Sequence, residues 1–165
     1  MLNRLVAVAL ALAASTASAQ YVKLGAPAPE IDLPSLSGGR VQLSKLRGHP
    51  VVVLFWSTWC PSCRSDFPEL VRAFHTHHPA GLVVLGVNGR DQEYSTGAVK
   101  KFLNEFAVPF ETVLDERGRT RDTFLIIGLP TTVFIDSGGV VRRVGIGPIS
   151  RAALDSGIAT ILPSP

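Results

Sequence analysis

The sequence predicts an α/β fold in which a central β-sheet has helices on both faces. Two observations lead to this prediction. The β-branched apolar runs at residues 51–55 and 82–87 are typical of strands that are covered on both faces. Segments with apolar residues at helical spacing alternate with such strands along the chain. This alternation indicates a layered α/β domain.

Length, composition and charge narrow the class further. The chain has 165 residues, which is enough for one domain with a sizeable core. With 46% hydrophobic and 18% charged residues, it has the composition of an ordinary globular protein. The net charge of +3 comes without any block of Lys and Arg. We therefore expect no nucleic-acid partner and no binding to an acidic membrane surface.

The N-terminal segment, MLNRLVAVALALAASTASAQ, differs from the rest of the chain. The basic residue Arg4 precedes an apolar run at residues 5–14, and Ala17-Ser18-Ala19 follows. This order predicts a secretory signal peptide at residues 1–19, with the folded domain at 20–165. The apolar run is half of the roughly 20 residues that span a bilayer. An uncleaved N-terminal membrane anchor is the alternative.

The first half of the domain begins with a lead-in rich in Pro and Gly. We expect a β-hairpin there, with strands at residues 31–33 and 41–43 around a turn at 37–39. The buried strand at 51–55 follows, and apolar residues at helical spacing then predict a helix over about 60–78.

The second half contains six further expected elements. In chain order they are a strand, a helix, a short strand, a short helix, a β-hairpin and a closing helix, at residues 82–87, 98–106, 112–114, 120–124, 131–136 with 140–144, and 150–162. Ser137-Gly138-Gly139 predicts the hairpin turn. Ser150 and Pro163 are suited to begin and end the closing helix.

Both cysteines of the chain lie in the segment FWSTWCPSCRSDFP. Cys60 comes after the buried strand and at the start of the predicted helix, where Pro61 suits the first helical position. The unpaired N–H groups and the dipole of the helix favour a thiolate at Cys60, and the thiolate is the nucleophile in disulfide exchange. Cys63, one turn later, is expected to be shielded and suited to resolving a mixed disulfide.

A structural bridge and a zinc site compete with this redox interpretation. A bridge across so short a loop removes little entropy from the unfolded chain. Zinc needs four ligands, and the chain has only two thiols. The nearest other ligands, His75, His77 and His78, lie far along the same helix. We therefore expect no metal. The role of the histidine cluster stays open.

Several motifs resemble one known family. FWSTWCPSC and the segment Gly128-Leu-Pro-Thr-Thr132 resemble the thioredoxin superfamily. The lead-in LGAPAPEIDLPSLSGGRVQLSKLRGHP, which peroxiredoxins share, together with LGVNGRDQE and LPTTVFID, is similar to the TlpA/ResA-like branch with its AhpC/TSA-type lead-in. The resemblance covers nearly all of residues 20–165. It implies a thioredoxin-like fold, with a central mixed β-sheet and an N-terminal β-hairpin extension.

The resemblance also implies roles for individual residues. Cys60 matches the attacking cysteine and Cys63 the resolving one, so that the two form the redox disulfide. Trp59 matches the tryptophan that packs beside the active site. Pro130 matches a cis-proline opposite the sulfurs, and the backbone of Leu129 would bind an extended substrate by strand addition.

Asp66 lies three residues after Cys63, and hence on the same helical face. The ResA-like group commonly has a Glu at this position, which couples to the titration of the cysteines. Asp is one methylene shorter than Glu. The sequence therefore leaves two alternatives, in which the Asp66 carboxylate contacts the Cys63 sulfur directly or through a water. Burial and thiolate repulsion would raise its pKa. The alternative is a solvated Asp on the helix surface.

The resemblance implies a periplasmic thiol-disulfide oxidoreductase that reduces protein disulfides without a cofactor. An inner-membrane electron donor of the DsbD or CcdA type would re-reduce it. Its partners would belong to cytochrome c maturation or to copper-site assembly, a substrate class that rests on the resemblance alone. We expect a monomer, although no motif determines the oligomeric state.

Three other activities stay open. The protein could act as an oxidant or isomerase, because the potentials of CxxC proteins range from about −270 to −120 mV. A peroxidase of the peroxiredoxin type has a Ser or Thr three residues before its reactive cysteine and a Pro four residues before that. Ser57 fits the first of these positions, but Val53 stands where the Pro would be. A copper chaperone of the related Sco type would have three residues between its cysteines and an added histidine.

Overall fold

The computed structural model describes residues 22–163, so the predicted signal peptide lies outside the described residues. These residues form a five-stranded sheet in the order β5-β4-β3-β6-β7. The strands are β3 (Val51–Trp56), β4 (Val83–Asn88), β5 (Glu111–Leu114), β6 (Thr131–Ile135) and β7 (Val141–Ile146). β3, β4 and β5 are parallel, whereas β6 is antiparallel to both β3 and β7. The predicted α/β fold with a mixed sheet is confirmed.

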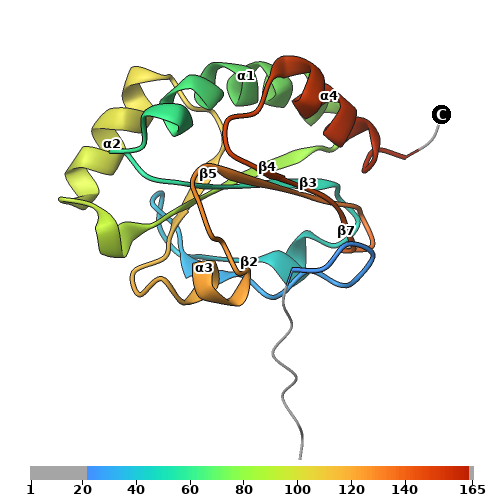
Figure 1. The fold of residues 1–165 in the computed structure, drawn as a ribbon, viewed down its shortest axis with the longest axis horizontal. Helices are drawn as coiled ribbons and strands as arrows, with labels where there is room; N and C mark the ends of the chain where they lie inside the picture. The colour runs from blue at the N-terminus through green and yellow to red at the C-terminus, as the bar shows by residue number, and fades with distance from the viewer. Residues whose placement is uncertain (1–21, 164–165) are drawn as a thin grey trace, which may run out of the picture.

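Helices cover both faces of this sheet (Figure 1). One face packs against α1 (Pro61–His77), α2 (Thr96–Glu105) and α4 (Arg151–Ala159). The other face packs against α3 (Arg119–Thr123), the 3-10 turn η1 (Leu43–Leu46) and the N-terminal lead-in. The lead-in contains the predicted hairpin, formed by β1 (Asp32–Pro34) and β2 (Arg40–Gln42). Two further 3-10 turns are η2 (His78–Ala80) and η3 (Arg90–Gln92).

Strand β3 lies in the middle of the sheet, and all six of its residues are buried. Because successive side chains of a strand point to opposite faces, its residues divide between two core clusters. Val52, Leu54 and Trp56 pack under α1, α2 and α4. Val51, Val53 and Phe55 pack against the other layer. This anchoring holds the end of β3, from which the cysteine loop leaves, in a fixed place.

Most elements lie within one residue of the predicted limits, but α2, β7 and α4 differ by two or three residues at one end. α2 starts at Thr96, earlier than expected, because the Ser95 side chain accepts a hydrogen bond from the Ala98 N–H and caps the helix. β7 extends to Ile146 because its last residues pair with the start of β6. α4 ends at Ala159, and the chain continues in tight turns.

The lead-in also runs along the outer side of β7, at one edge of the sheet. The Gly25 N–H donates to the Val141 carbonyl at 2.8 Å, and the Val141 N–H donates to the Ala26 carbonyl at 2.9 Å. Pro27 and Val140 form an isolated antiparallel bridge. The residues before Gly25 are therefore placed beside the later part of β7.

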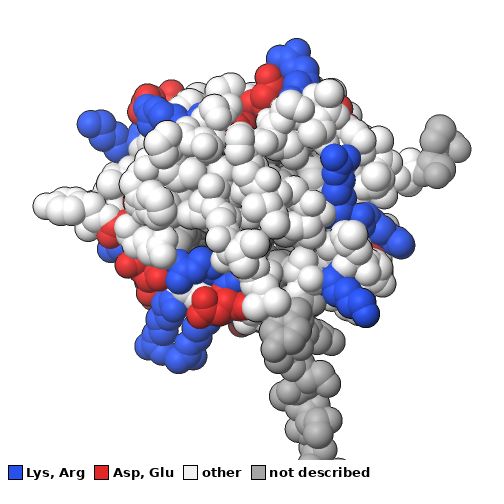
Figure 2. Space-filling model, viewed as in Figure 1, with Lys and Arg blue, Asp and Glu red and all other residues white. Residues whose placement is uncertain are grey.

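Charged side chains are spread over the surface in both signs. On the face shown in Figure 2, Lys, Arg, Asp and Glu lie mainly around the periphery, and the middle of the face is uncharged. Ion pairs join some of the charged side chains of the described residues, such as Arg40 with Asp32 and Arg142 with Asp136. This face carries no large patch of one sign.

Candidate active site

The two cysteines lie where β3 passes into α1. Cys60 is the N-cap of α1 and has an extended backbone, and Pro61 takes the first helical position. The Cys60 sulfur accepts a hydrogen bond from the Cys63 N–H at 3.1 Å. The two residues form a disulfide, with their Cα atoms 5.2 Å apart. Cys60 therefore lies at the positive end of the helix dipole, as the position of Pro61 predicts.

The two cysteines differ in their access to solvent. Cys60 is 4% exposed and Cys63 is completely buried. Cys60 borders a hollow of about 380 Å³, whose wall also includes Trp59, Gln92 and Leu129. Of the two sulfurs, that of Cys60 is therefore the one that another molecule can approach.

The loop before β6 forms the other side of this hollow. The Leu129–Pro130 peptide bond is cis, as the family resemblance implies. Thr131, the next residue, pairs with Phe55 near the end of β3. The Pro130 carbonyl accepts a hydrogen bond from the Gly147 N–H at 2.8 Å. Sheet pairing thus brings residues about 70 positions apart in the chain into one site.

Asp66 is buried within α1 and is only 1% exposed. Burial raises the pKa of its carboxyl from 3.8 to about 6, and a hydrogen bond that its Oδ1 accepts from the Ile149 N–H opposes this rise. Its Oδ2 has no hydrogen-bond partner among the described residues. The alternative of a solvated surface Asp is wrong, because the segment before α4 covers this side of α1.

Glu93 is a functional candidate that the sequence analysis did not find. It follows η3, and its carboxylate is buried. Oε1 accepts hydrogen bonds from the Thr58 N–H at 2.6 Å and from the Asn88 side chain at 2.8 Å, and Oε2 accepts one from the Thr58 hydroxyl. The loop before Cys60 is thereby tied to the end of β4. The segment LGVNGRDQE was a sequence signal, but it did not indicate the partner.

A paired cation also borders the hollow at Cys60. The Arg121 side chain contributes to its wall, and its Nη2 lies 3.2 Å from Oδ2 of Asp91. The Arg121 N–H donates to Asp115 at 2.9 Å. Because its charge is partnered, Arg121 shapes this wall without leaving an isolated positive charge in it.

Other polar groups lie away from the disulfide. Within residues 22–163, no group of three or more His, Cys, Asp and Glu side chains is arranged to hold a metal ion. His78 forms a hydrogen bond with the Leu82 carbonyl through Nδ1, at 3.1 Å.

Among the helices that the structure describes, none is both long and apolar enough to span a membrane.

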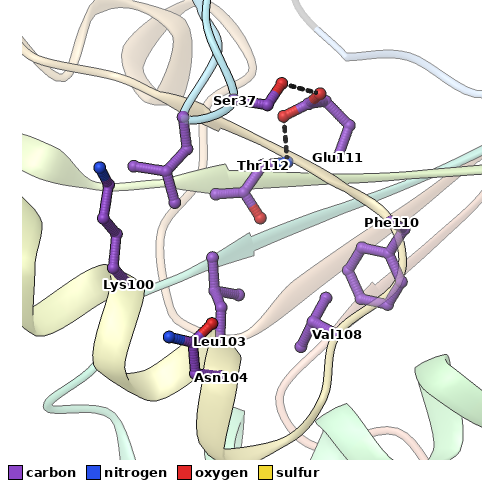
Figure 3. A pocket seen from close by; sticks show the side chains of 9 residues that line it. Ser37, Lys100, Leu103, Asn104, Val108, Phe110, Glu111 and Thr112 are labelled. Atoms are coloured by element: carbon purple, nitrogen blue, oxygen red, sulfur yellow. Dashed lines mark hydrogen bonds between the residues drawn. The ribbon is translucent and has the colours of Figure 1, made fainter.

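A separate hollow lies at the β5 edge of the sheet, between α2 and the tip of the β1–β2 hairpin (Figure 3). Leu103 and Val108 contribute apolar walls, and Lys100 borders it. Glu111 accepts a hydrogen bond from the Ser37 hydroxyl at 2.7 Å. The hollow contains neither cysteine, so it is distinct from the disulfide site.

The fold and the site together define a thioredoxin-like protein whose chemistry is thiol–disulfide exchange. A family model described as the AhpC/TSA family matches residues 24–144. The chain belongs to this family. The match covers the lead-in, the cysteine segment and the sheet up to β7.

Individual relatives agree with this assignment. The chain is 30% identical to the thiol-disulfide oxidoreductase ResA of Geobacillus kaustophilus, over 86% of this chain and 80% of the relative. It is 34% identical to the thiol:disulfide interchange protein DsbE of Pseudomonas aeruginosa, over 78% and 69%. The crystal structure of a DsbE-type protein from Chlorobium tepidum superposes with a TM-score of 0.79, at 30% identity, over 86% of this chain and 99% of the other.

These similarities confirm the TlpA/ResA-like resemblance within the thioredoxin superfamily. The protein is a protein thiol-disulfide oxidoreductase of the ResA/DsbE type, with Cys60 and Cys63 as its CxxC pair. Its substrates are accordingly protein thiols and disulfides.

Proposed function

We propose that the protein works in the periplasm as a reductant of protein disulfides. The observation that carries the proposal is the different placement of the two sulfurs: Cys60 caps α1 at the border of a hollow, and Cys63 is buried behind it. This arrangement suits attack by Cys60 and resolution by Cys63. The predicted signal peptide and the similarity to ResA and DsbE support an exported protein.

The proposed reaction begins with both cysteines reduced. The Cys60 thiolate attacks one sulfur of a partner disulfide, so that a Cys60–partner bond forms and the partner sulfur–sulfur bond breaks. The Cys63 thiol then loses its proton and attacks the Cys60 sulfur. The two partner sulfurs are released as thiolates and take up protons from solution, so that the partner leaves as a dithiol and the Cys60–Cys63 disulfide remains. Two electrons have passed to the partner, and the protein needs a dithiol donor for its next turnover.

Asp66 is proposed to accept the Cys63 proton in the second step. Its carboxyl lies one helical turn after Cys63, is buried, and has a pKa of about 6. At neutral pH it is therefore mostly ionised and able to act as a base, and its Oδ2 has no other partner in the described residues. The transfer is direct or passes through a water.

The reducing direction and the partners are further parts of the proposal. Similarity to ResA and DsbE supports a donor of the DsbD or CcdA type and partners in cytochrome c maturation or copper-site assembly. Measuring the Cys60–Cys63 equilibrium against glutathione tests the direction. A potential near −120 mV, the value of the strong oxidant DsbA, would contradict the reductant proposal and favour the oxidant alternative.

The Cys63→Ala variant tests the order of attack and identifies the partner. Because it lacks the resolving thiol, it is expected to accumulate a covalent complex with its substrate through Cys60. The Cys60→Ala variant is the matched control and is expected to trap far less. Equal trapping by both variants would contradict the assigned roles.

A further inference from the structure

Exposed apolar side chains gather at one part of the surface. In residues 22–163, six large apolar side chains are exposed: Leu24, Trp59, Tyr94, Leu125, Ile127 and Ile146. Four of these six, including Ile127 at 84% exposure, line one hollow of about 260 Å³. Single exposed apolar residues are normal, but a contiguous cluster marks a binding surface.

This apolar hollow adjoins the hollow at Cys60. Ile126 and Ile127 line both of them, so the segment before the cis-proline loop is their common wall. Among the described residues, no charged side chain lines the apolar hollow that contains Leu24 and Ile146. A molecule bound at Cys60 can therefore extend over Ile127 into an apolar space.

The lead-in segment and the last residues of β7 complete this hollow. Pairing of Gly25 with Val141 sets Leu24 on its border, and Ile146 comes from the end of β7. Ile146 also lies close to the cis-proline loop, because a Cβ at Gly128 would be 3.9 Å from its Cγ2. Leu125 has a positive φ of 49°, which is uncommon for a non-glycine residue, and its side chain is exposed on the same border.

We propose that the hollow bordered by Leu24, Leu125, Ile127 and Ile146, here called the lead-in subsite, binds an uncharged apolar side chain of the partner polypeptide. The inference rests on the proposed function, because it places the partner's cysteine at Cys60. An extended chain advances about 3.3 Å per residue. The apolar side chain therefore belongs to a residue a few positions from the partner's cysteine, and the subsite makes the protein selective for partners with that pattern.

Short synthetic peptides with one cysteine, held as a mixed disulfide with thionitrobenzoate, provide the test. One Leu is moved along an otherwise Ser- and Gly-based peptide. The Cys60 thiolate of the reduced protein bonds to the peptide sulfur, and thionitrobenzoate leaves with the electron pair and is measured by its absorbance. At one Leu position we expect about a tenfold faster release than with the Ser peptide, equivalent to about 1.4 kcal/mol.

Two variants of exposed residues separate the subsite from the chemistry. Ile146→Ser and Leu24→Ser are expected to abolish most of the Leu preference, while the rate with dithiobis(nitrobenzoate), which carries no Leu side chain, stays within about twofold of that of the unchanged protein. Val108→Ser, in the hollow at the opposite edge of the sheet (Figure 3), is the matched control and should keep the preference.

The outcomes distinguish the two proposals. If the unchanged protein reacts with the peptides at a rate that does not depend on the Leu position, the proposal of the lead-in subsite is overturned and the reductant proposal stands. The same holds if both variants keep the preference. If the reduced protein releases no thionitrobenzoate from any peptide, the proposed function itself fails. Circular dichroism of each variant confirms that it is folded.

Discussion

Glu93 and Thr58 are joined by two hydrogen bonds, although 35 positions separate them in the sequence. One carboxylate oxygen accepts from the Thr58 N–H and the other from its hydroxyl. Thr58 lies two positions before Cys60, in the loop between β3 and α1. The buried carboxylate thus holds the backbone that leads into the attacking cysteine.

We expect Glu93→Gln to weaken this loop. Gln keeps one oxygen for the Thr58 N–H, but its NH2 group would have to donate to the Thr58 hydroxyl instead of accepting from it, and both contacts lose the negative charge. Hydrogen bonds to charged groups contribute about 1.5–3 kcal/mol, and we expect a fall of about 2 kcal/mol in the free energy of unfolding, measured by urea denaturation.

A positioning role for Glu93 also predicts a change in reactivity, since the loop sets the place of Cys60. Alkylation of Cys60 in the reduced variant should be slower than in the unchanged protein at neutral pH. Glu105→Gln is the control, because Glu105 pairs with Arg64 at the exposed surface and such pairs contribute about 0–1 kcal/mol. If both variants lose the same stability and keep the same alkylation rate, Glu93 has no special role.

Burial of Asp66 predicts a pH-dependent stability. With a pKa of about 6 when folded and an ordinary value of 3.8, the folded protein binds more protons than the unfolded chain between these limits. Stability should therefore fall as the pH rises from about 4 to 6, by up to about 3 kcal/mol from this group.

The Asp66→Asn variant removes this titration while keeping an oxygen for the Ile149 N–H. The oxidised variant should be more stable than the unchanged protein at pH 7, and the difference should shrink toward pH 4. Urea denaturation at both pH values measures it. A difference that is the same at both would show that Asp66 does not titrate as its burial indicates.

The same variant tests the proposed proton transfer. We expect Asp66→Asn to slow the second step, resolution of the mixed disulfide by Cys63, by about a hundredfold, the lower end of general-base effects. The first step, attack by Cys60, should change much less. Stopped-flow measurements of both steps decide, with Asp122→Asn on the exposed side of α3 as control. Equal slowing of both steps would instead indicate a general structural disturbance.

Gly157 is predicted to be required for the packing of α4 on the sheet. A Cβ at this position would lie 2.4 Å from the ring of Phe134, near the end of β6. Because overpacking a core costs about 1–3 kcal/mol, Gly157→Ala should lower the free energy of unfolding by about 2 kcal/mol.

Gly97→Ala in α2 is the matched control for this helix substitution. A Cβ there meets only the Ser95 hydroxyl, at 3.5 Å, an ordinary contact. Ala favours a helix over Gly by about 0.5–1 kcal/mol, so this variant should be neutral or slightly stabilised. Thermal unfolding of both variants provides the comparison, and a stable Gly157→Ala protein would mean that α4 can move away from β6.

The elements that were predicted well are those whose signals are local. The apolar run of β3, the Pro61 start of α1 and the Gly-rich turn before β7 each depend on neighbouring residues, through strand burial, helix-start geometry and turn conformation. The resemblance added the cis bond before Pro130, which spacing alone did not indicate.

The limits of several elements could not be predicted as well, because other parts of the chain set them. β7 reaches Ile146 through pairing with Thr131, and the lead-in lies along β7 through its bonds to Val141. Sheet register depends on which strand is the neighbour. The pattern of apolar residues along a single strand shows which of its faces are buried, but it does not show which strand pairs with it.

By itself, the sequence determined the fold class, the position of Cys60 at a helix start and the shielding of Cys63 behind it, because hydrophobic periodicity, the helix-start proline and residue spacing act within a few residues. Only the tertiary structure decided that Asp66 is buried against a segment 83 positions later, that Glu93 binds Thr58, and that the lead-in completes an apolar hollow beside Cys60. These features depend on contacts between distant segments, and burial and its electrostatic consequences exist only once those segments have packed together.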